Sequence, residues 1–149
     1  MRMILETCCI VAWLGMLLVA GYVVAPILFA HLSKMTAGNI AGELFHYVSY
    51  TGMVATVCLW FSGCLKKGFK VYLSSFKSSC LLAAFLLMMI NEWLITPVII
   101  ALKTKGVHIL HQTLGGSFAA WHGASQIIYL LTAICGVLFM MAWAKELRS

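Results

Sequence analysis

Four long apolar stretches dominate the pattern of hydrophobic and polar positions along the chain. They cover about residues 3–30, 41–65, 78–102 and 117–144, and each is continuous rather than alternating. The hydrocarbon core of a bilayer is about 30 Å thick, which a helix of about 20 apolar residues crosses. Strands of an outer-membrane barrel would instead alternate apolar and polar residues over about ten positions. The pattern therefore predicts four membrane-spanning helices.

The composition excludes the other broad classes of protein. Of the 149 residues, 63% are hydrophobic and only 9% are charged, and the mean hydropathy is +1.01. A soluble domain carries about 25% charged residues, and a disordered chain is poor in apolar residues. Lipid also requires every backbone polar group to be bonded inside the fold. We expect an all-α fold, an integral membrane four-helix bundle that forms one domain over residues 1–149.

The first stretch resembles a signal peptide only superficially. Its uncharged part runs from Cys8 to Ala30, which is longer than the 7–15 apolar residues of a signal peptide. Pro26 directly after Ala25 also makes a poor cleavage context. We expect this segment to be retained as a helix.

The basic residues predict the orientation of the bundle. With four spans both termini lie on one face, which carries seven of the ten basic residues, namely Arg2, Lys66, Lys67, Lys70, Lys77, Lys145 and Arg148. The opposite face carries Lys34, Lys103 and Lys105. The positive-inside rule therefore predicts cytoplasmic termini in a bacterial inner (plasma) membrane. The lysines are interpreted as lipid anchors, so no nucleic acid is expected as a partner, and a second copy or another membrane protein stays open.

With this orientation the cysteines and histidines separate along the membrane normal. All six cysteines fall in the inner halves of their spans, where the reducing side makes disulfides rare and packing is the simplest role. All five histidines fall at or near the outer end, and they are His31, His46, His108, His111 and His122. Candidate chemistry is therefore expected in the outer half.

Two acidic residues accompany these histidines. Glu43 and His46 share a helix face at i and i+3, the spacing with which di-metal helical bundles present ligands. Glu92 interrupts the third apolar stretch, where an acidic residue costs roughly 2.5–3.5 kcal/mol at mid-span and needs an internal partner or a proton. Neutral imidazole is a good ligand for transition metals and haem iron. We predict that Glu43, His46, Glu92 and His122 converge, with His46 and His122 as ligands of a transition metal or haem.

Further polar residues are secondary candidates in the same half of the bundle. They are His31, Asn91, His108, His111, Ser125 and Gln126. Structural features are also predicted: Gly38, Gly42 and Gly123 should permit close helix approach, and Pro26 and Pro97 should kink the first and third helices.

Short motifs in all four spans resemble a known family. They are Gly21-x4-Pro26-x-Leu28-Phe29, Ala37-Gly38-x3-Gly42-x-Leu44-Phe45, Asn91 with Pro97, and Phe118-x3-His122-Gly123-x-Ser125. Together they resemble the transmembrane-protein-205-like family of small four-helix membrane domains of unknown function. The resemblance implies a compact membrane bundle, adds weight to His122, and brings no activity.

Three function classes remain open from the sequence. The first is a binding or redox module with an outer-side metal or haem. The second is a small transporter, or a subunit of one, in which Glu92 carries a proton or cation. The third is a non-catalytic membrane subunit or assembly factor. An enzyme is the least supported class, because no spacing places a nucleophile beside a base.

Overall fold

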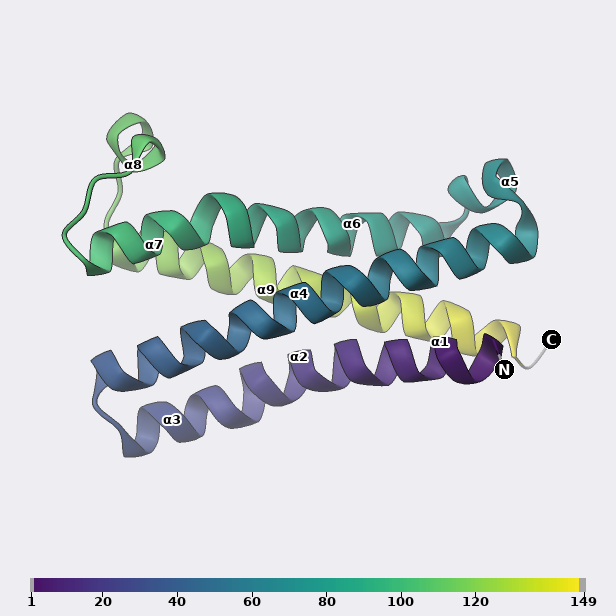
Figure 1. Ribbon diagram of the computed structural model, residues 1–149, viewed down its shortest axis with the longest axis horizontal. Coiled ribbons are helices and arrows are strands. Elements are labelled where there is room, and N and C mark those ends of the chain that lie inside the picture. The colour runs from purple at the N-terminus through teal and green to yellow at the C-terminus, as the bar shows by residue number, and fades with distance from the viewer. Residues whose placement is uncertain (1, 148–149) are drawn as a thin grey trace.

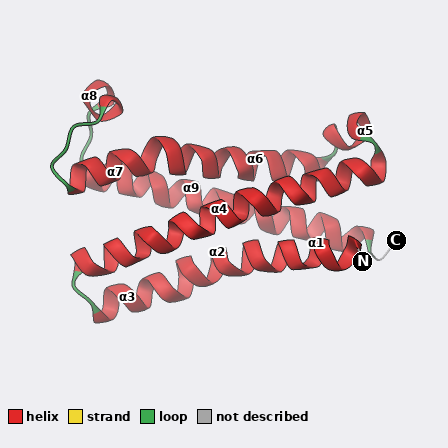
Figure 2. Cartoon of the chain, in the orientation of Figure 1, coloured by secondary structure: helices red, strands yellow, loops and turns green. Residues whose placement is uncertain are grey.

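Four long helices make up the computed structural model, which describes residues 2–147. They cover Met3–His31, Lys34–Lys67, Phe76–Lys103 and Phe118–Glu146, and each is long and apolar enough to cross a membrane. Figure 2 shows helices joined by short loops, and the described residues contain no strand. The all-α fold and the number of spanning helices agree with the sequence prediction.

The first and third long helices each contain π-helical turns. The first comprises α1 (Arg2–Ile10), η1 (Val11–Gly15), α2 (Met16–Val19), η2 (Ala20–Val24) and α3 (Ala25–His31). The third comprises α6 (Phe76–Ile90), η3 (Asn91–Ile95) and α7 (Thr96–Lys103).

Two of these turns end two residues before a proline. Pro26 and Pro97 each occupy the second residue of the α-helix that follows η2 or η3. A proline lacks an N–H and crowds the carbonyl four residues earlier, and a widened π turn relieves that crowding. Each helix therefore continues through its proline.

The second and fourth long helices are uninterrupted. Helix α4 (Lys34–Lys67) begins at the cap residue Ser33, whose hydroxyl accepts a hydrogen bond from the amide of Thr36 at 3.2 Å. It therefore starts seven residues before the predicted position 41, because the capped polar turn extends beyond the apolar stretch. Helix α9 (Phe118–Glu146) is capped in the same way by Ser117. Two short helices, α5 (Phe69–Leu73) and α8 (Ile109–Leu114), lie in the connections.

The long helices run side by side, with the two termini at one end of the molecule (Figure 1). Helix α4 packs against both the first long helix and α6, and α6 packs against α9. Helix α5 lies at the end that carries the termini, whereas the α3–α4 turn and α8 lie at the other end.

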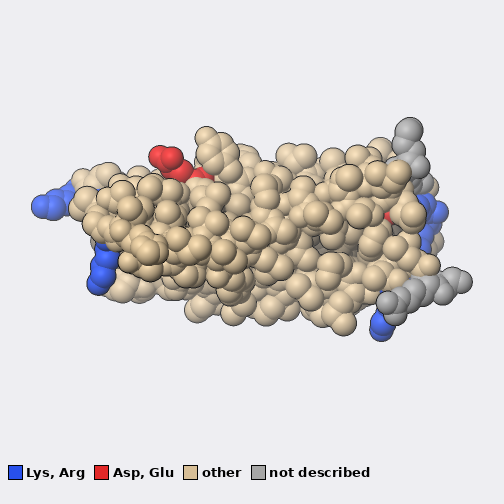
Figure 3. Space-filling model, turned by 90° about the horizontal axis from the view of Figure 1, so that it is seen from below, with Lys and Arg blue, Asp and Glu red and all other residues tan. Residues whose placement is uncertain are grey.

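On the face seen in Figure 3 the Lys and Arg side chains lie at the two ends of the molecule, and the band between them is uncharged except for a few acidic atoms. This distribution is that of a membrane-spanning bundle. Which end faces the cytoplasm stays a prediction, and Arg148 and the side chain of Arg2, which enter that prediction, lie outside the described residues.

Close packing in the centre depends on glycines that admit an indole ring. Trp13 is buried, and a Cβ added at Gly52 of α4 would lie 2.7 Å from its Nε1 atom. A Cβ at Gly136 of α9 would lie 3.3 Å from the Cη2 atom of the same ring. The prediction of close approach at Gly42 and Gly123 is wrong, because nothing lies within 4 Å of a Cβ at either position.

The end of the molecule that carries the termini is held by ion pairs, one of which has a buried carboxylate. The carboxylate of Glu6 is buried and accepts hydrogen bonds from Ser62 at 2.5 Å, Lys66 at 2.7 Å and Trp143 at 3.0 Å. One carboxylate thus joins the first helix, α4 and α9. Because Lys67 and Lys77 likewise pair with Glu146, three lysines that were interpreted as lipid anchors also join parts of the protein.

Tyr72 of α5, outside the long helices, packs against α4 at the end of the molecule that carries the termini. The ring of Tyr72 in α5 fills the space beside Gly63 of α4, where any Cβ would overlap it. Burial raises the pKa of Tyr72 to about 12, so its phenol stays neutral at physiological pH.

Candidate functional site

A buried carboxylate lies near the middle of the third long helix. Glu92 belongs to the π turn η3, and its side chain is 6% exposed. Counting from the centre of Phe76–Lys103, the residue lies about 4 Å from mid-helix at 1.5 Å per residue. Single π turns inside α-helices are frequent at functional sites, because the wider turn reorients a side chain and loosens the backbone bonds around it.

The partner of this carboxylate comes from the neighbouring helix. The Nδ1 atom of His46 in α4 is hydrogen-bonded to the Oε1 atom of Glu92. The imidazole is 50% exposed, whereas the carboxylate is almost completely enclosed. The pair therefore connects a buried acid to the outside of the bundle through a half-exposed imidazole.

Aromatic rings surround the imidazole. The ring of Tyr50 lies 4.6 Å from that of His46 between centroids, at an interplanar angle of 59°. Trp93, the residue after Glu92, donates a hydrogen bond from its indole N–H to the hydroxyl of Tyr50 at 3.4 Å. A protonated His46 thus lies within cation–π range of an aromatic face.

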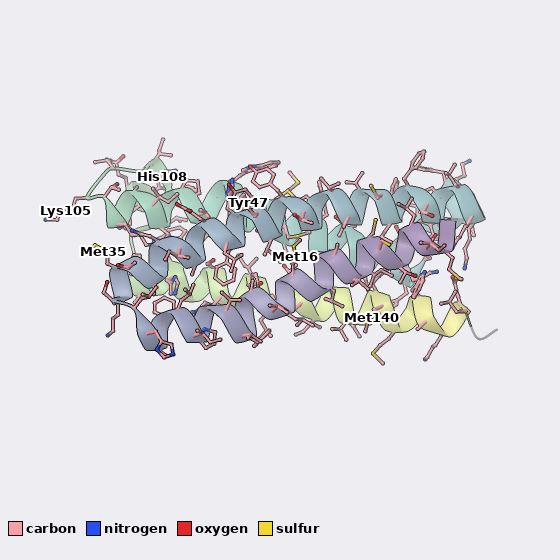
Figure 4. The ribbon with its side chains drawn as sticks, turned by 60° about the horizontal axis from the view of Figure 1, so that its bottom comes forward. Met16, Met35, Tyr47, Lys105, His108 and Met140 are labelled. Carbon is pink, nitrogen blue, oxygen red and sulfur yellow. The ribbon has the colours of Figure 1, made fainter. Side chains whose placement is uncertain are left out.

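These four side chains line one wide, open pocket of about 560 Å³. Its other walls come from α7 and the loop that follows it, with Thr96, Pro97, Ile100, Ala101, Thr104, Gly106 and Val107. Figure 4 shows Lys105 and His108 of this region at the same end of the bundle as Met35, with Tyr47 further along α4 toward its middle. The pocket therefore reaches from that end of the bundle to the buried carboxylate.

A second, very small cavity lies on the other side of the η3 backbone. It measures about 10 Å³ and is lined by Asn91, Ser49, Tyr129 and Thr132 among others. Asn91 is buried, and its side-chain oxygen has no hydrogen-bond partner among the described residues. The volume is close to the smallest that holds one water molecule, and the lining is polar. Adjacent residues of the π turn thus point polar groups into two different spaces.

The predicted convergence of four ligands is wrong. Among residues 2–147 no group of three or more His, Cys, Asp or Glu side chains is arranged to hold a metal ion. Glu43 is exposed on α4. His122 is half-buried on α9, stacked on Phe118 at 5.7 Å and 3.3 Å from the amide nitrogen of Gln126. Of these four residues, only His46 and Glu92 are in contact with each other.

The secondary candidates are distributed around the same end of the bundle. His31 ends α3 and is exposed. His108 caps α8, where its Nδ1 atom accepts a hydrogen bond from the amide of Leu110, and His111 bonds the carbonyl of Gly116 at 2.9 Å. Gln126 is exposed and Ser125 half-buried on α9. The two loop histidines therefore have local structural roles, which stabilise the connection through α8.

The sequence prediction did not include two residues of the site, Tyr50 and Trp93. Tyr50 follows His46 at i+4 and so lies on the same helix face, which the helical period could have revealed. Trp93 carries no such signal, because the π turn shifts its direction relative to a regular helix.

Comparison with protein families gives one match. A family model described as "Domain of unknown function (DUF4149)" matches residues 8–108. This range contains His46 and Glu92, and the motifs from Gly21 to Pro97, but not the Phe118–Ser125 motif. No curated protein and no solved structure matches the chain.

Proposed function

Because the chain belongs to the DUF4149 family, whose description gives no activity, we propose a function from the geometry of its buried carboxylate. The protein is a small membrane carrier, or a carrier subunit, that exchanges a proton for a cation at the Glu92–His46 pair. The observation that supports it is the contact between a carboxylate enclosed near mid-helix and a half-exposed imidazole.

An ionised acidic side chain at this depth in a membrane is energetically unfavourable, so its presence points to a function. An ionised carboxylate at the centre of a spanning helix costs roughly 2.5–3.5 kcal/mol, and intramembrane ionisable residues commonly mark ion or proton pathways. A structural role would be better served by a neutral side chain, since replacing a buried ion pair by apolar residues is often neutral or stabilising. Among the described residues Glu92 is the acid that combines this depth with a pocket.

The proposed exchange balances charge and protons. In the resting state a protonated His46 and an ionised Glu92 form a neutral pair. A cation that enters the pocket takes the place of the imidazolium at the carboxylate, and His46 releases its proton. One proton therefore leaves for each monovalent cation bound, and the site stays neutral in both states. Neutrality matters because an uncompensated charge at this depth is expensive.

The exposed fractions of Glu92 and His46 support these roles, in which Glu92 binds the cation and His46 releases the proton. Glu92 is held by the packed η3 turn, whereas His46 is half-exposed and can turn away from it. The pocket opens beside both, so the cation and the proton have access to the same pair. A metal-ion site has no comparable support among residues 2–147, where no ligand group of three occurs.

The proposal also includes the orientation of the bundle in the membrane and its assembly into an oligomer. We place the termini and the Lys66–Lys77 connection in the cytoplasm and the pocket in the outer half of a bacterial plasma membrane. Because the pocket lies on the side of the bundle and four helices enclose little space, a homo-oligomer provides the route across the membrane. The resemblance to the transmembrane-protein-205-like family agrees with a small membrane domain.

Proton movement in reconstituted vesicles tests the proposed function. The full chain is placed in vesicles with an internal pH dye, and proton efflux is followed when an inorganic or organic cation is added outside. Wild type should release protons, and Glu92→Gln should abolish the release while retaining its helical circular-dichroism spectrum. Glu43→Gln is the matched control, since it removes an exposed carboxylate of α4. If no cation gives efflux in wild type, or if Glu92→Gln exchanges normally, the proposal fails.

A further inference from the structure

The dimensions and lining of the pocket point to a substrate class. We infer that the cation is a hydrophobic organic cation, held between the Glu92 carboxylate and the aromatic rings of Tyr50 and Trp93. This inference rests on the proposed function, because it uses the same carboxylate and the same exchange with the proton of His46. It goes further by excluding inorganic ions as the preferred substrate.

The size of the pocket favours an organic ligand. Pockets for organic ligands measure about 300–1,000 Å³ and are lined mostly by apolar and aromatic side chains with few polar groups. This pocket measures about 560 Å³ and fits that description. A bare inorganic cation needs several oxygen ligands close together. Glu92 is the one carboxylate in the lining, accompanied only by the hydroxyls of Tyr50, Thr96 and Thr104.

The charge of the lining favours a cation over an anion. Apart from Glu92 and His46 the lining contains no ionisable side chain other than the phenol of Tyr50, and in particular no lysine or arginine. Once His46 has lost its proton, the walls carry one negative charge. A fatty-acid anion or a phosphate group would meet an enclosed carboxylate without a cationic partner, which costs several kcal/mol. A cation meets a carboxylate that has just lost its own counter-ion.

The imidazole of His46 lies beside the ring of Tyr50, with 4.6 Å between the ring centroids, and in contact with Glu92. In the resting state proposed above this imidazole carries a proton. It therefore occupies the position that we assign to the substrate, as an internal competitor. Tyr50 and Trp93 are 41% and 51% exposed, so their faces remain available when His46 turns away. Cation–π contacts strengthen when water is excluded, as it is in a lipid-facing pocket.

The outer walls fit the apolar part of such a ligand. Ile100 and Val107 line the pocket and are themselves exposed, at 55% and 76%. Ile100 belongs to the spanning helix and faces lipid within a bilayer, so a hydrophobic cation can enter sideways from the membrane in which it already concentrates, whereas Val107 belongs to the loop after α7 and lines the end of the pocket. The open side of the pocket makes this route direct, because no packed helix has to move.

Binding of tetraphenylphosphonium to the purified full chain in detergent tests the inference. Wild type should bind this cation and release about one proton per cation bound, whereas tetraphenylborate, an anion of the same shape, should not bind. Glu92→Gln should lose at least tenfold in affinity and release no proton. Tyr50→Ala and Trp93→Ala should each lose about 3- to 30-fold, and Trp93→Phe should recover most of that loss.

Phe61→Ala is the matched control, because Phe61 is an exposed aromatic residue of α4 outside the pocket. Circular dichroism and gel filtration identify any variant that fails to fold, and the comparison of the two ions in wild type needs no variant. Equal binding of tetraphenylborate and tetraphenylphosphonium would show an apolar groove and overturn the inference. Absence of tetraphenylphosphonium binding, with inorganic cations still exchanging for protons through Glu92, would overturn the inference and leave the proposed function standing. Absence of any Glu92-dependent exchange would refute both.

Discussion

Gly52 lies where α4 meets both the first long helix and α6, and its replacement by alanine probes the packing that assembles the site. The new Cβ would lie 2.6 Å from the sulfur of Met88 and 2.7 Å from the indole nitrogen of Trp13. Atoms do not approach that closely, so the helices must separate or the side chains must shift. Since Met88 lies one turn before Glu92, a displaced α6 moves the carboxylate away from His46.

The magnitude follows from two opposing effects. Extra atoms in a packed core cost about 1–3 kcal/mol, while alanine in place of glycine inside a helix gains up to about 1 kcal/mol. Gly42→Ala on the same helix is the matched control, because nothing lies within 4 Å of its Cβ and only the gain applies. Gly52→Ala should therefore be about 1–3 kcal/mol less stable than Gly42→Ala, or about 2–12 °C lower in Tm for a chain of this length.

Thermal unfolding of both variants, followed by circular dichroism in one detergent, measures this difference. The double variant Gly52→Ala with Trp13→Leu should recover part of the loss relative to Trp13→Leu alone, because the smaller side chain makes room for the Cβ. Proton release at the site should fall in Gly52→Ala and stay normal in Gly42→Ala. A Tm for Gly52→Ala equal to or above that of Gly42→Ala would refute the reasoning.

Three further predictions concern the end of the molecule that carries the termini. Glu6→Gln should lower the free energy of unfolding by about 1–3 kcal/mol, because the ammonium of Lys66 loses its buried partner. Glu43→Gln, at an exposed position, should change it by no more than about 0.5 kcal/mol. Because the pKa of Tyr72 is raised to about 12 in the folded protein, its contribution to stability is fully present below pH 10. That contribution, up to about 3 kcal/mol, is lost as the pH rises from 10 to about 12. A pH series of unfolding should therefore be steeper there for wild type than for Tyr72→Phe, and parallel curves would contradict the assignment. A membrane-impermeant maleimide should label Lys70→Cys only after spheroplasts are opened, and labelling of intact spheroplasts would reverse the proposed orientation.

The helices could be predicted because apolar length is a local property. A span needs about 20 consecutive apolar residues, and the chain shows that condition directly at four places. The start of α4 could not be located by the same criterion, because Lys34 to Asn39 are polar enough to lie beyond the apolar band yet remain helical behind the Ser33 cap. Both prolines were recognised, but the π turns that accommodate them depend on backbone geometry.

The individual members of the site could be predicted, but their grouping could not. Glu92 and His46 are conspicuous as ionisable residues in apolar stretches, and the sequence marks them by that contrast alone. His122 and Glu43 carry the same mark, yet His122 contacts Gln126 of its own helix and Glu43 is exposed. Helices α4 and α9 are apolar on nearly every face, so their sequences do not indicate which face turns inward.

The sequence by itself determined that this protein is a helical membrane chain with four spans and a few isolated ionisable groups. Only the tertiary structure decided which of those groups meet. The rotation of each helix about its axis is set by close contacts such as Trp13 against Gly52 and Gly136, which join residues far apart in the chain. In lipid no amphipathic pattern is needed to orient a helix, so packing shape takes over that role and places Glu92 beside His46.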